Sequence, residues 1–276
     1  MTGAPHGGAP LSREDFLAIS RMVRESSGIV LSDVKRDLVN GRLRRRLRTL
    51  GIGSFSEYRE ILEGPDGTEE RVHMVNAITT NLTNFFREPH HFEFLRNEIL
   101  PKLADKRKRL RIWSAGCSTG EEPYTIAMVL MDTLGDGHAW EITASDISTR
   151  ILDRARGAHY AMERANNIPP ALLRKFCLKG VRSQEGTFLI APELRQRVHF
   201  RHLNLFQPLP DNMGQFDVIF LRNVMIYFDM DTKRKVVANL VPKLRRDGYF
   251  LVGHSETLGG ITDQLTSEKP SIYRKP

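Results

Sequence analysis

The sequence contains few cysteines and no long apolar run, and these two features limit the classes of protein to which it can belong. Only two cysteines occur, Cys117 and Cys177, in different segments and without Cys-x-x-Cys or Cys/His spacing. We therefore expect neither a disulfide framework nor a zinc site, nor any other metal centre. No stretch approaches the roughly 18 apolar residues that a membrane span needs, so we expect no stable membrane insertion.

The start of the chain lacks the features of an export signal. Residues 1–11 are rich in Gly, Ala and Pro without a basic start or a long apolar stretch, so we expect a disordered tail and a cytoplasmic protein. Hydrophobic residues make up 40% and charged residues 27%, which indicates a globular chain beyond that tail. The net charge of +8 fits nucleic acid, an anionic membrane surface or an acidic protein equally well.

Residues 12–80 carry helix signals throughout. Ser12 and Ser54 stand at N-cap positions with an acidic residue three positions later, and Gly28 follows the end of the first amphipathic run. A further helix is expected around residues 69–78. These signals predict a small all-helical N-terminal domain.

Beyond a polar linker at residues 81–88, short apolar runs alternate with helical segments. The expected strands are residues 110–115, 141–144, 198–203, 216–221 and 248–252. This alternation is typical of βαβ units and predicts an α/β domain over residues 89–276, with a doubly wound, Rossmann-like parallel sheet. One stretch, about residues 176–195, fits poorly and predicts a small inserted β-subdomain.

The first expected strand leads into a glycine-rich turn and an apolar helix. Gly116 and Gly120 let the backbone bend sharply and approach a ligand, at a place where nucleotide-like cofactors bind. Asp146 stands at the expected end of the next strand, where a carboxylate can bond ribose hydroxyls. An ordinary tight turn between strand and helix is the alternative interpretation of the glycines.

Two glutamates at the start of this helix favour one class of cofactor. Dinucleotide enzymes hold a pyrophosphate at a helix N-terminus, but Glu121 and Glu122 place negative charge there, which repels phosphate. The sequence therefore favours S-adenosylmethionine, with S-adenosylhomocysteine as its product, over NAD. Simple stabilisation of the helix dipole is the other explanation for this pair.

Two further segments are candidates for the site. Arg222-Asn223 ends an apolar run and puts polar groups at the carboxyl edge of the sheet. Tyr227, which follows, is interpreted either as facing the reacting methyl group or as a core aromatic residue. Residues 81–88 read as a plain interdomain linker in isolation, yet they lie where they could fold over the cofactor.

Five segments together resemble the CheR-type chemotaxis receptor methyltransferases. They are Asn-Leu-Thr-Asn-Phe-Phe-Arg-Glu at 81–88, Ser-Thr-Gly-Glu-Glu-Pro-Tyr at 118–124, Ser-Asp-Ile at 145–147, Arg-Asn-Val-Met-Ile-Tyr-Phe-Asp at 222–229 and Gly-His-Ser-Glu at 253–256. Their order and spacing match as well, and the likeness runs from about residue 12 to 275. It implies an S-adenosylmethionine-dependent protein-glutamate O-methyltransferase, with an all-α N-terminal domain and a class I methyltransferase domain that carries a β-subdomain. Its substrate would be glutamates on the cytoplasmic methylation helices of chemoreceptors, esterified for sensory adaptation.

The resemblance also assigns site residues by position. Asn81, Thr83 and Arg87 are expected to reach the cofactor from the linker, and Glu121 and Asp146 to bind its methionyl and ribose portions. The other expected cofactor-binding residues are Gly116, Asn204, Leu205, Arg222 and Asn223. We expect Arg87 and Tyr227 to act in catalysis by orienting the acceptor carboxylate.

Methyl transfer to a glutamate carboxylate depends more on positioning of the reactants than on proton transfer. A glutamate has a pKa near 4.3 and is ionised at neutral pH, so no general base is needed. An in-line carboxylate next to an activated methyl group is then expected to react mainly because it is held in place.

A basic helix that begins near Ser32 is the expected surface for the receptor. Acidic methylation helices would be steered onto it in a salt-dependent way. The residues expected to contact them are Lys35, Arg36, Arg42, Arg45 and Arg46. A solvated helix face is the alternative. Residues 179–186 lack the Gly-x-Gly of family members that dock on a receptor's C-terminal pentapeptide, which argues against such docking here.

Two other functions fit part of the sequence. A methyltransferase for RNA or another protein would suit the positive charge, but the chain has neither an Asp/Asn-Pro-Pro-aromatic motif nor a Pro-Cys nucleophile. A non-catalytic adaptor that binds S-adenosylmethionine is the other, and the intact set of site residues argues against it. We expect a monomer without a nucleic-acid partner.

Overall fold

The computed structural model describes residues 10–65, 67–79, 82–104 and 109–276, and it divides into two compact units. One unit contains residues 1–80 and 227–229, and the other contains residues 81–226 and 230–276. Most of the expected disordered tail, residues 1–9, lies outside the described residues. Leu11, the last residue of that expected tail, is buried. In the part that the structure describes, no helix combines the length and apolar character needed to cross a membrane.

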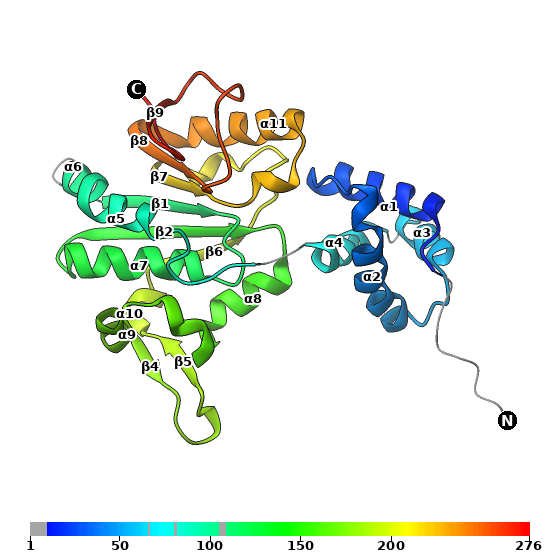
Figure 1. Cartoon of the computed structure of the whole chain (residues 1–276), viewed down its shortest axis with the longest axis horizontal. Helices are drawn as coiled ribbons and strands as arrows, with labels where there is room; N and C mark the ends of the chain where they lie inside the picture. The colour runs from blue at the N-terminus through cyan, green and yellow to red at the C-terminus, as the bar shows by residue number, and fades with distance from the viewer. Residues whose placement is uncertain (1–9, 66, 80–81, 105–108) are drawn as a thin grey trace. The chain divides into compact units, whose positions relative to one another are not determined.

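The first unit is a helical bundle (Figure 1). Its elements are α1 (Arg13–Ser27), the 3-10 turn Asp33–Lys35, α2 (Arg36–Leu50), α3 (Phe55–Glu63) and α4 (Gly67–Ile78). The predicted caps are confirmed, because Ser12 accepts the N–H of Asp15 and Ser54 accepts that of Glu57. Gly28 ends α1 in the left-handed conformation, with φ of 75°. These helices bury a common core.

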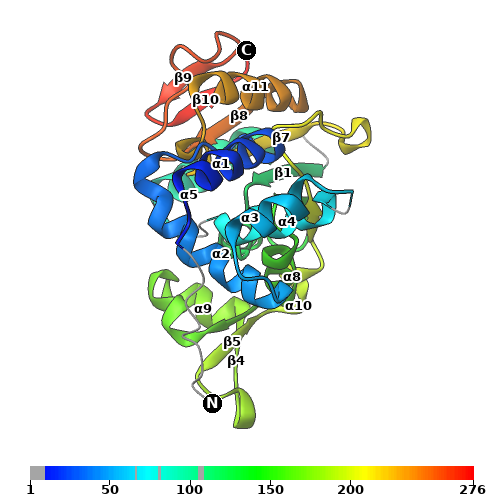
Figure 2. The same ribbon diagram turned by 90° about the vertical axis from the view of Figure 1, so that its right-hand side faces the viewer.

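The second unit is built on one mixed sheet. Its strands are β1 (Arg109–Ala115), β2 (Ala139–Asp146), β6 (Val198–His202), β7 (Phe216–Leu221), β8 (Leu244–Val252), β9 (Thr266–Lys269) and β10 (Ile272–Arg274). They lie in the order β6-β2-β1-β7-β8-β10-β9, and Figure 2 shows β8, β10 and β9 at one end. The strands from β6 to β8 pair in parallel, whereas β10 runs antiparallel to both of its neighbours. The strand order reverses between β1 and β7. The carboxyl ends of these two strands therefore form the topological switch point of the sheet.

The last two strands were not predicted from the sequence. Every residue of β9 is exposed, and β10 is only three residues long, so neither shows the alternation of buried and exposed residues that marks a strand. The expected parallel sheet is therefore a mixed one.

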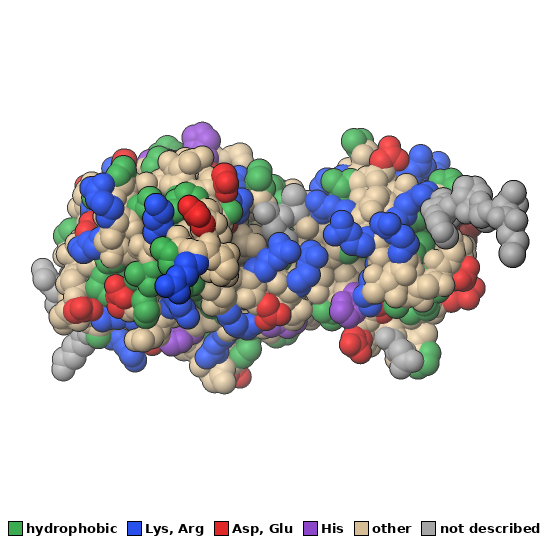
Figure 3. All heavy atoms as spheres, turned by 90° about the horizontal axis from the view of Figure 1, so that it is seen from below, with side chains coloured by type: hydrophobic (Ala, Val, Ile, Leu, Met, Phe, Trp, Pro, Cys, Tyr) green, Lys and Arg blue, Asp and Glu red, His purple; other side chains and the backbone are tan. Residues whose placement is uncertain are grey.

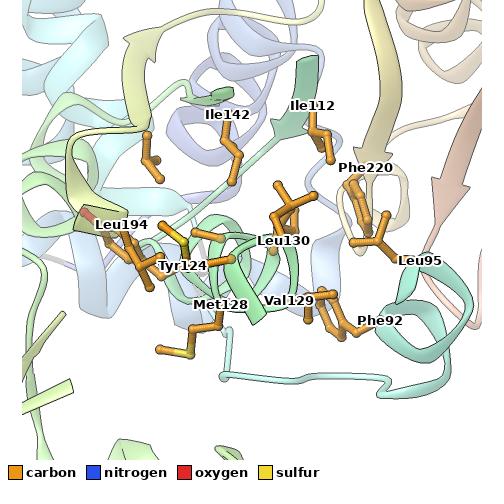
Figure 4. Close-up of a cluster of buried hydrophobic side chains, with 14 of the residues drawn as sticks. Phe92, Leu95, Ile112, Tyr124, Met128, Val129, Leu130, Ile142, Leu194 and Phe220 are labelled. Atoms are coloured by element: carbon orange, nitrogen blue, oxygen red, sulfur yellow. The ribbon is translucent and has the colours of Figure 1, made fainter. Parts of the chain in front are cut away.

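Helices cover this sheet and fix the site's position. They are α5 (His90–Phe94), a π-helical turn (Leu95–Ile99), α6 (Leu100–Ala104), α7 (Glu121–Leu134), α8 (Thr149–Gly157) and α11 (Met230–Leu240). Figure 4 shows Leu130 of α7 pointing to Ile112 and Ile142 of the sheet, with Val129 beside Phe92 and Met128 on the opposite side of the helix. This buried packing holds the first turn of α7 beside the end of β1.

The β-subdomain is a second, antiparallel sheet with the order β3-β5-β4. It consists of β3 (His159–Ala161), β4 (Cys177–Lys179) and β5 (Thr187–Ile190), flanked by α9 (Pro170–Phe176) and α10 (Pro192–Arg195). The hairpin expected within residues 176–195 corresponds to β4 and β5. The third strand comes from earlier in the chain and is too short to be recognised by periodicity. The remaining 3-10 turns are Met162–Asn167, Arg182–Gln184, Asp211–Met213, Met225–Tyr227 and Val241–Lys243.

Candidate cofactor and active site

The glycine-rich turn lies at the switch point of the sheet, directly after β1. Gly116 and Gly120 have φ of 91° and 97°, a region in which only glycine is free of strain. A Cβ on Gly116 would overlap Cγ2 of Val224, so no larger residue fits there. The N–H of Gly116 donates to the carbonyl of Ser145 (2.7 Å) and joins the turn to the end of β2.

Asp146 ends β2 beside this turn, at the predicted place. Its Oδ2 accepts the N–H of Ser118 (2.9 Å) and its Oδ1 accepts the N–H of Ser148 (3.0 Å). Burial raises the pKa of Asp146, while the backbone N–H bonds oppose that rise. The residue is partly exposed, and each carboxylate oxygen has a second lone pair, so it can also accept bonds from ligand hydroxyls.

The acidic pair at the start of α7 is matched by two arginines. Glu121 is fully buried, accepts the hydroxyl of Thr119 (2.6 Å) and forms an ion pair with Arg164. Glu122 accepts a bond from Arg222 (2.9 Å). Because each of these guanidinium groups already faces a carboxylate, the helix start is a poor site for a pyrophosphate.

The polar groups beside the turn after β1 fit S-adenosylmethionine. The hydroxyl of Ser118 is buried without a hydrogen-bond partner among the described residues. Buried hydroxyls are almost always bonded, so this one is a candidate contact for a ligand. A ribose needs carboxylate acceptors such as Asp146, and a cofactor without phosphate needs no cation at the turn.

The carboxyl ends of β2 and β6 meet at the same edge. The N–H of Leu203 donates to the carbonyl of Asp146 (3.1 Å). This bond places Asn204 and Leu205, two predicted cofactor-binding residues, next along the chain. The side chain of Asn204 caps its own turn by accepting the N–H of Phe206 (3.1 Å). The structure therefore gathers Gly116, Asp146 and Asn204-Leu205 in one region.

The described part of the linker, residues 82–88, packs on the second unit. Phe85 is fully buried, with its ring centroid 5.0 Å from that of Tyr160 and 5.7 Å from that of Phe188. The N–H of Phe86 donates to Oγ1 of Thr125 (3.2 Å) on α7. Asn81 lies outside the described residues.

Two residues of this linker have unusual backbone conformations. Phe86 and Glu88 have φ of 52° and 58°, which is rare for residues other than glycine and is found disproportionately at functional sites. Thr83 is buried, and Arg87 is partly exposed and donates to the carbonyl of Leu82 (2.7 Å).

Arg222, which follows β7, ties the linker to the sheet. Its side chain is 2% exposed and bonds Glu122, Glu88 (3.1 Å) and the carbonyl of Arg87. Asn223 adds a bond from its Nδ2 to the other oxygen of Glu88 (3.2 Å). Burial alone would raise the pKa of Glu88, but the charge of Arg222 and these hydrogen bonds outweigh it and hold the pKa below its usual value.

His91 lies against this network and predicts how stability depends on pH. It is fully buried, with Nε2 2.8 Å from Oγ of Ser271. Burial lowers its pKa to about 3, and the charge of Arg222 acts in the same direction. Below about pH 6.5 an unfolded histidine takes up a proton that the folded one does not, so the free energy of unfolding falls with pH from 6.5 towards 3.

At pH 5 this effect is expected to cost about 2 kcal/mol relative to pH 8. The measurement is urea unfolding of the wild type and of His91→Gln at both values of pH. Tryptophan fluorescence reports on the second unit alone, because the sequence contains only two tryptophans, Trp113 and Trp140, and both belong to that unit. The wild type should lose about 2 kcal/mol more than the variant. Equal losses would show that His91 does not carry this effect.

Tyr227 belongs to the helical unit, although it follows β7 in the chain. Its carbonyl accepts the N–H of Val30 (2.9 Å), and the Lys35 ammonium lies 5.6 Å from the centre of its ring. The structure thus groups Tyr227 with a predicted receptor-binding residue, and Arg87 with the cofactor residues. The proposed catalytic roles of Arg87 and Tyr227 stay predictions.

The predicted receptor-binding residues differ in their surroundings. Arg46 pairs with the buried Glu70 through two bonds of 2.7 and 2.6 Å, and Arg42 donates to the carbonyl of Ile78. Arg36 and Arg45 are exposed. Figure 3 shows basic side chains at the surface of each unit on the face in view. Arg42 and Arg46 therefore contribute to the bundle itself, and the exposed pair is better suited to a partner.

Several residues of the site were not singled out from the sequence. Arg164 pairs with Glu121, Glu88 pairs with Arg222, and Glu256 accepts the N–H of Asn223 (2.8 Å). Glu88 and Glu256 end two of the segments that resemble the CheR family, which was the only available signal for them.

Fold and site together define the class of this domain. A doubly wound sheet with a glycine-rich turn at its switch point, a carboxylate at the end of β2 and acidic groups at the start of α7 is the architecture of an S-adenosylmethionine-dependent methyltransferase.

The comparisons with known proteins make the assignment specific. Residues 81–273 match the family model "CheR methyltransferase, SAM binding domain", and residues 14–79 match "CheR methyltransferase, all-alpha domain". The chemotaxis protein methyltransferase of Escherichia coli K12 is 42% identical over 268 residues, 95% of this chain and 91% of that protein. Chemotaxis protein methyltransferase 2 of Pseudomonas aeruginosa is 42% identical over 263 residues, 95% of this chain and 93% of its own. This chain belongs to the CheR methyltransferase family, and its second unit is a domain that binds S-adenosylmethionine.

Solved structures add only a distant likeness of fold. TrmN from Thermus thermophilus aligns with 66% of this chain and 48% of its own, at 15% identity and a TM-score of 0.39. A likeness at this level carries no functional information.

Among the described residues, no three His, Cys, Asp or Glu side chains gather in a way that could hold a metal ion.

Proposed function

We propose that this protein transfers a methyl group from S-adenosylmethionine to glutamate side chains on the cytoplasmic methylation helices of chemoreceptors, forming glutamyl methyl esters. Membership of the CheR family supports this proposal, as does the naming of its relatives as chemotaxis protein methyltransferases. The observation that carries it is the polar group at the switch point, where the carboxylate of Asp146 and the buried hydroxyl of Ser118 lie beside the turn after β1.

The side chains of this site bind and orient more than they move protons. When bound, S-adenosylmethionine supplies a methyl group activated by a sulfonium. Asp146 would hold the ribose, and Arg87 and Tyr227 would orient the acceptor carboxylate. Arg87 must not hold that carboxylate too firmly, because the ester product has lost the charge. Burial lowers the pKa of His91 to about 3, so we assign it no proton transfer.

The partners follow from the same proposal. The acceptor helix would approach the exposed basic residues of α2, a monomer would act in the cytoplasm, and no nucleic acid would be bound. Residues 179–186, without a Gly-x-Gly, favour receptor binding without the C-terminal pentapeptide.

Labelled methyl transfer to different acceptors tests the proposed function. The protein is incubated with methyl-labelled S-adenosylmethionine and either membranes or RNA from a strain of the source organism that lacks its gene. We expect label on receptor bands, released as methanol by mild base, because carboxylate esters are base-labile. Base-stable label on RNA would assign another acceptor, and binding of the cofactor without any transfer would favour an adaptor.

Charge reversal on α2 tests the receptor surface. Combining Arg36→Glu with Arg45→Glu is expected to raise the receptor KM on the order of tenfold at low salt, and less at high salt, with little change in cofactor affinity. Arg234→Glu, an exposed arginine on α11, is the control. Arg46→Glu cannot serve, since it would bring two carboxylates together at buried Glu70 and disturb the bundle. An unaltered receptor KM in the double variant would show that the basic residues of α2 are only solvated and do not bind the receptor.

A further inference from the structure

A carboxylate from the loop after β8 holds the turn that follows β7. Glu256 is 9% exposed. Its Oε2 accepts the N–H of Gly253 (2.7 Å) and of Asn223 (2.8 Å), and its Oε1 accepts that of Ile226 (3.2 Å). Backbone N–H groups that converge in this way form an anion-binding nest. Here the anion is the chain's own carboxylate.

The two loops fit closely around this carboxylate. A Cβ on Gly253 would lie 2.6 Å from Nδ2 of Asn223 and 2.8 Å from Oε2 of Glu256, so only glycine is accommodated. Asn223 has φ of 57°, in the left-handed region that is strained for other residues. Its N–H bond to Glu256 and its side-chain bond to Glu88 hold it there.

We propose that Glu256 is a positioning residue for methyl transfer, which fixes the backbone from Asn223 to Ile226 and so keeps the Asn223 side chain at the cofactor crevice. The inference rests on the proposed function and on the predicted contact of Asn223 with the cofactor. Burial raises the pKa of Glu256, and the surrounding backbone N–H groups oppose that rise, as expected for a carboxylate held by hydrogen bonds. Glu256 acts through Asn223 and need not touch the reacting atoms.

Two substitutions of Glu256 measure this role. Glu256→Ala leaves three N–H groups without their acceptor and is expected to raise the Kd for S-adenosylhomocysteine and lower kcat by about tenfold or more. Glu256→Gln keeps one acceptor oxygen and should fall between Ala and wild type. The receptor KM should stay within about twofold, because α2 belongs to the other unit. Glu268→Ala, an exposed glutamate of the same unit, is the control.

Two readouts separate positioning from general loss of structure. Formate should occupy the emptied nest of Glu256→Ala and restore kcat about fivefold or more, whereas neutral formamide should not. In an Asn223→Ala background, Glu256→Ala should not weaken S-adenosylhomocysteine binding further.

Several results would overturn the inference. They are wild-type Kd and kcat in a folded Glu256→Ala variant, no rescue by formate, or additive effects of the two substitutions on Kd. If Glu256→Ala does not fold, as judged by tryptophan fluorescence, the same decision rests on Glu256→Gln. If the wild type forms no methyl ester on receptor membranes, the proposed function fails, but the titrations still decide whether Glu256 acts through Asn223.

Discussion

Replacing Arg222 with methionine is expected to lower the free energy of unfolding of the second unit by about 3 to 5 kcal/mol. The guanidinium is almost fully buried between Glu88 and Glu122, and it also bonds the carbonyl of Arg87. Its loss leaves two largely buried carboxylates without their counter-ion, and removal of one partner from such a network is strongly destabilising. The linker would also lose its attachment to the sheet, so methyl transfer should fall as well.

Urea unfolding followed by tryptophan fluorescence measures this effect. Arg245→Met provides a matched control, because Arg245 pairs with the buried Asp217 away from the cofactor crevice. Both variants should be destabilised, but only Arg222→Met should also lose cofactor affinity under conditions in which it is folded. A loss below about 1 kcal/mol for Arg222→Met would mean that the network is solvated and of the strength of a surface ion pair.

Replacing Asp146 with alanine is expected to raise the Kd for S-adenosylhomocysteine by about ten- to a hundredfold. Charge-assisted hydrogen bonds contribute about 1.5 to 3 kcal/mol, which corresponds to that range. The substitution removes the ribose acceptor and also frees the N–H groups of Ser118 and Ser148, which shape the turn. Asp146→Asn should weaken binding too, since its amide would face one of those N–H groups with another donor.

Calorimetric titration with S-adenosylhomocysteine measures this effect. Asp153→Ala, at an exposed position on α8, is the control and should bind like the wild type. An unchanged Kd for Asp146→Ala would show that Asp146 does not bind the cofactor and only stabilises the local turn.

Much of the fold could be predicted because its signals are local. The caps of α1 and α3 depend on residues three positions apart, and β1 and β7 each contain consecutive apolar residues, Ile112-Trp113 and Val218-Ile219-Phe220-Leu221. β3 and β10 could not be predicted, because strands of three residues show no periodicity. β9 is exposed at every position and has no apolar face to recognise.

The site was predicted where chemistry follows from residue type at the end of a strand, as for Gly116 and Asp146. Its ion pairs could not be predicted from spacing, because Arg222 and Glu122 are 100 residues apart and meet only when β7 pairs with β1. The same applies to Arg164 with Glu121. Tyr227 was predicted with the catalytic domain, but it groups with the helical unit, where its carbonyl accepts the N–H of Val30, and no sequence pattern indicated this.

Calorimetric titration of the folded wild type with S-adenosylhomocysteine, and separately with NAD, tests the central claim most directly. We predict saturable binding of one S-adenosylhomocysteine per chain and no heat with NAD, because acidic groups surround the start of α7 and disfavour a pyrophosphate. Absence of heat with S-adenosylhomocysteine, or comparable binding of NAD, would contradict the account of the crevice and the function proposed from it.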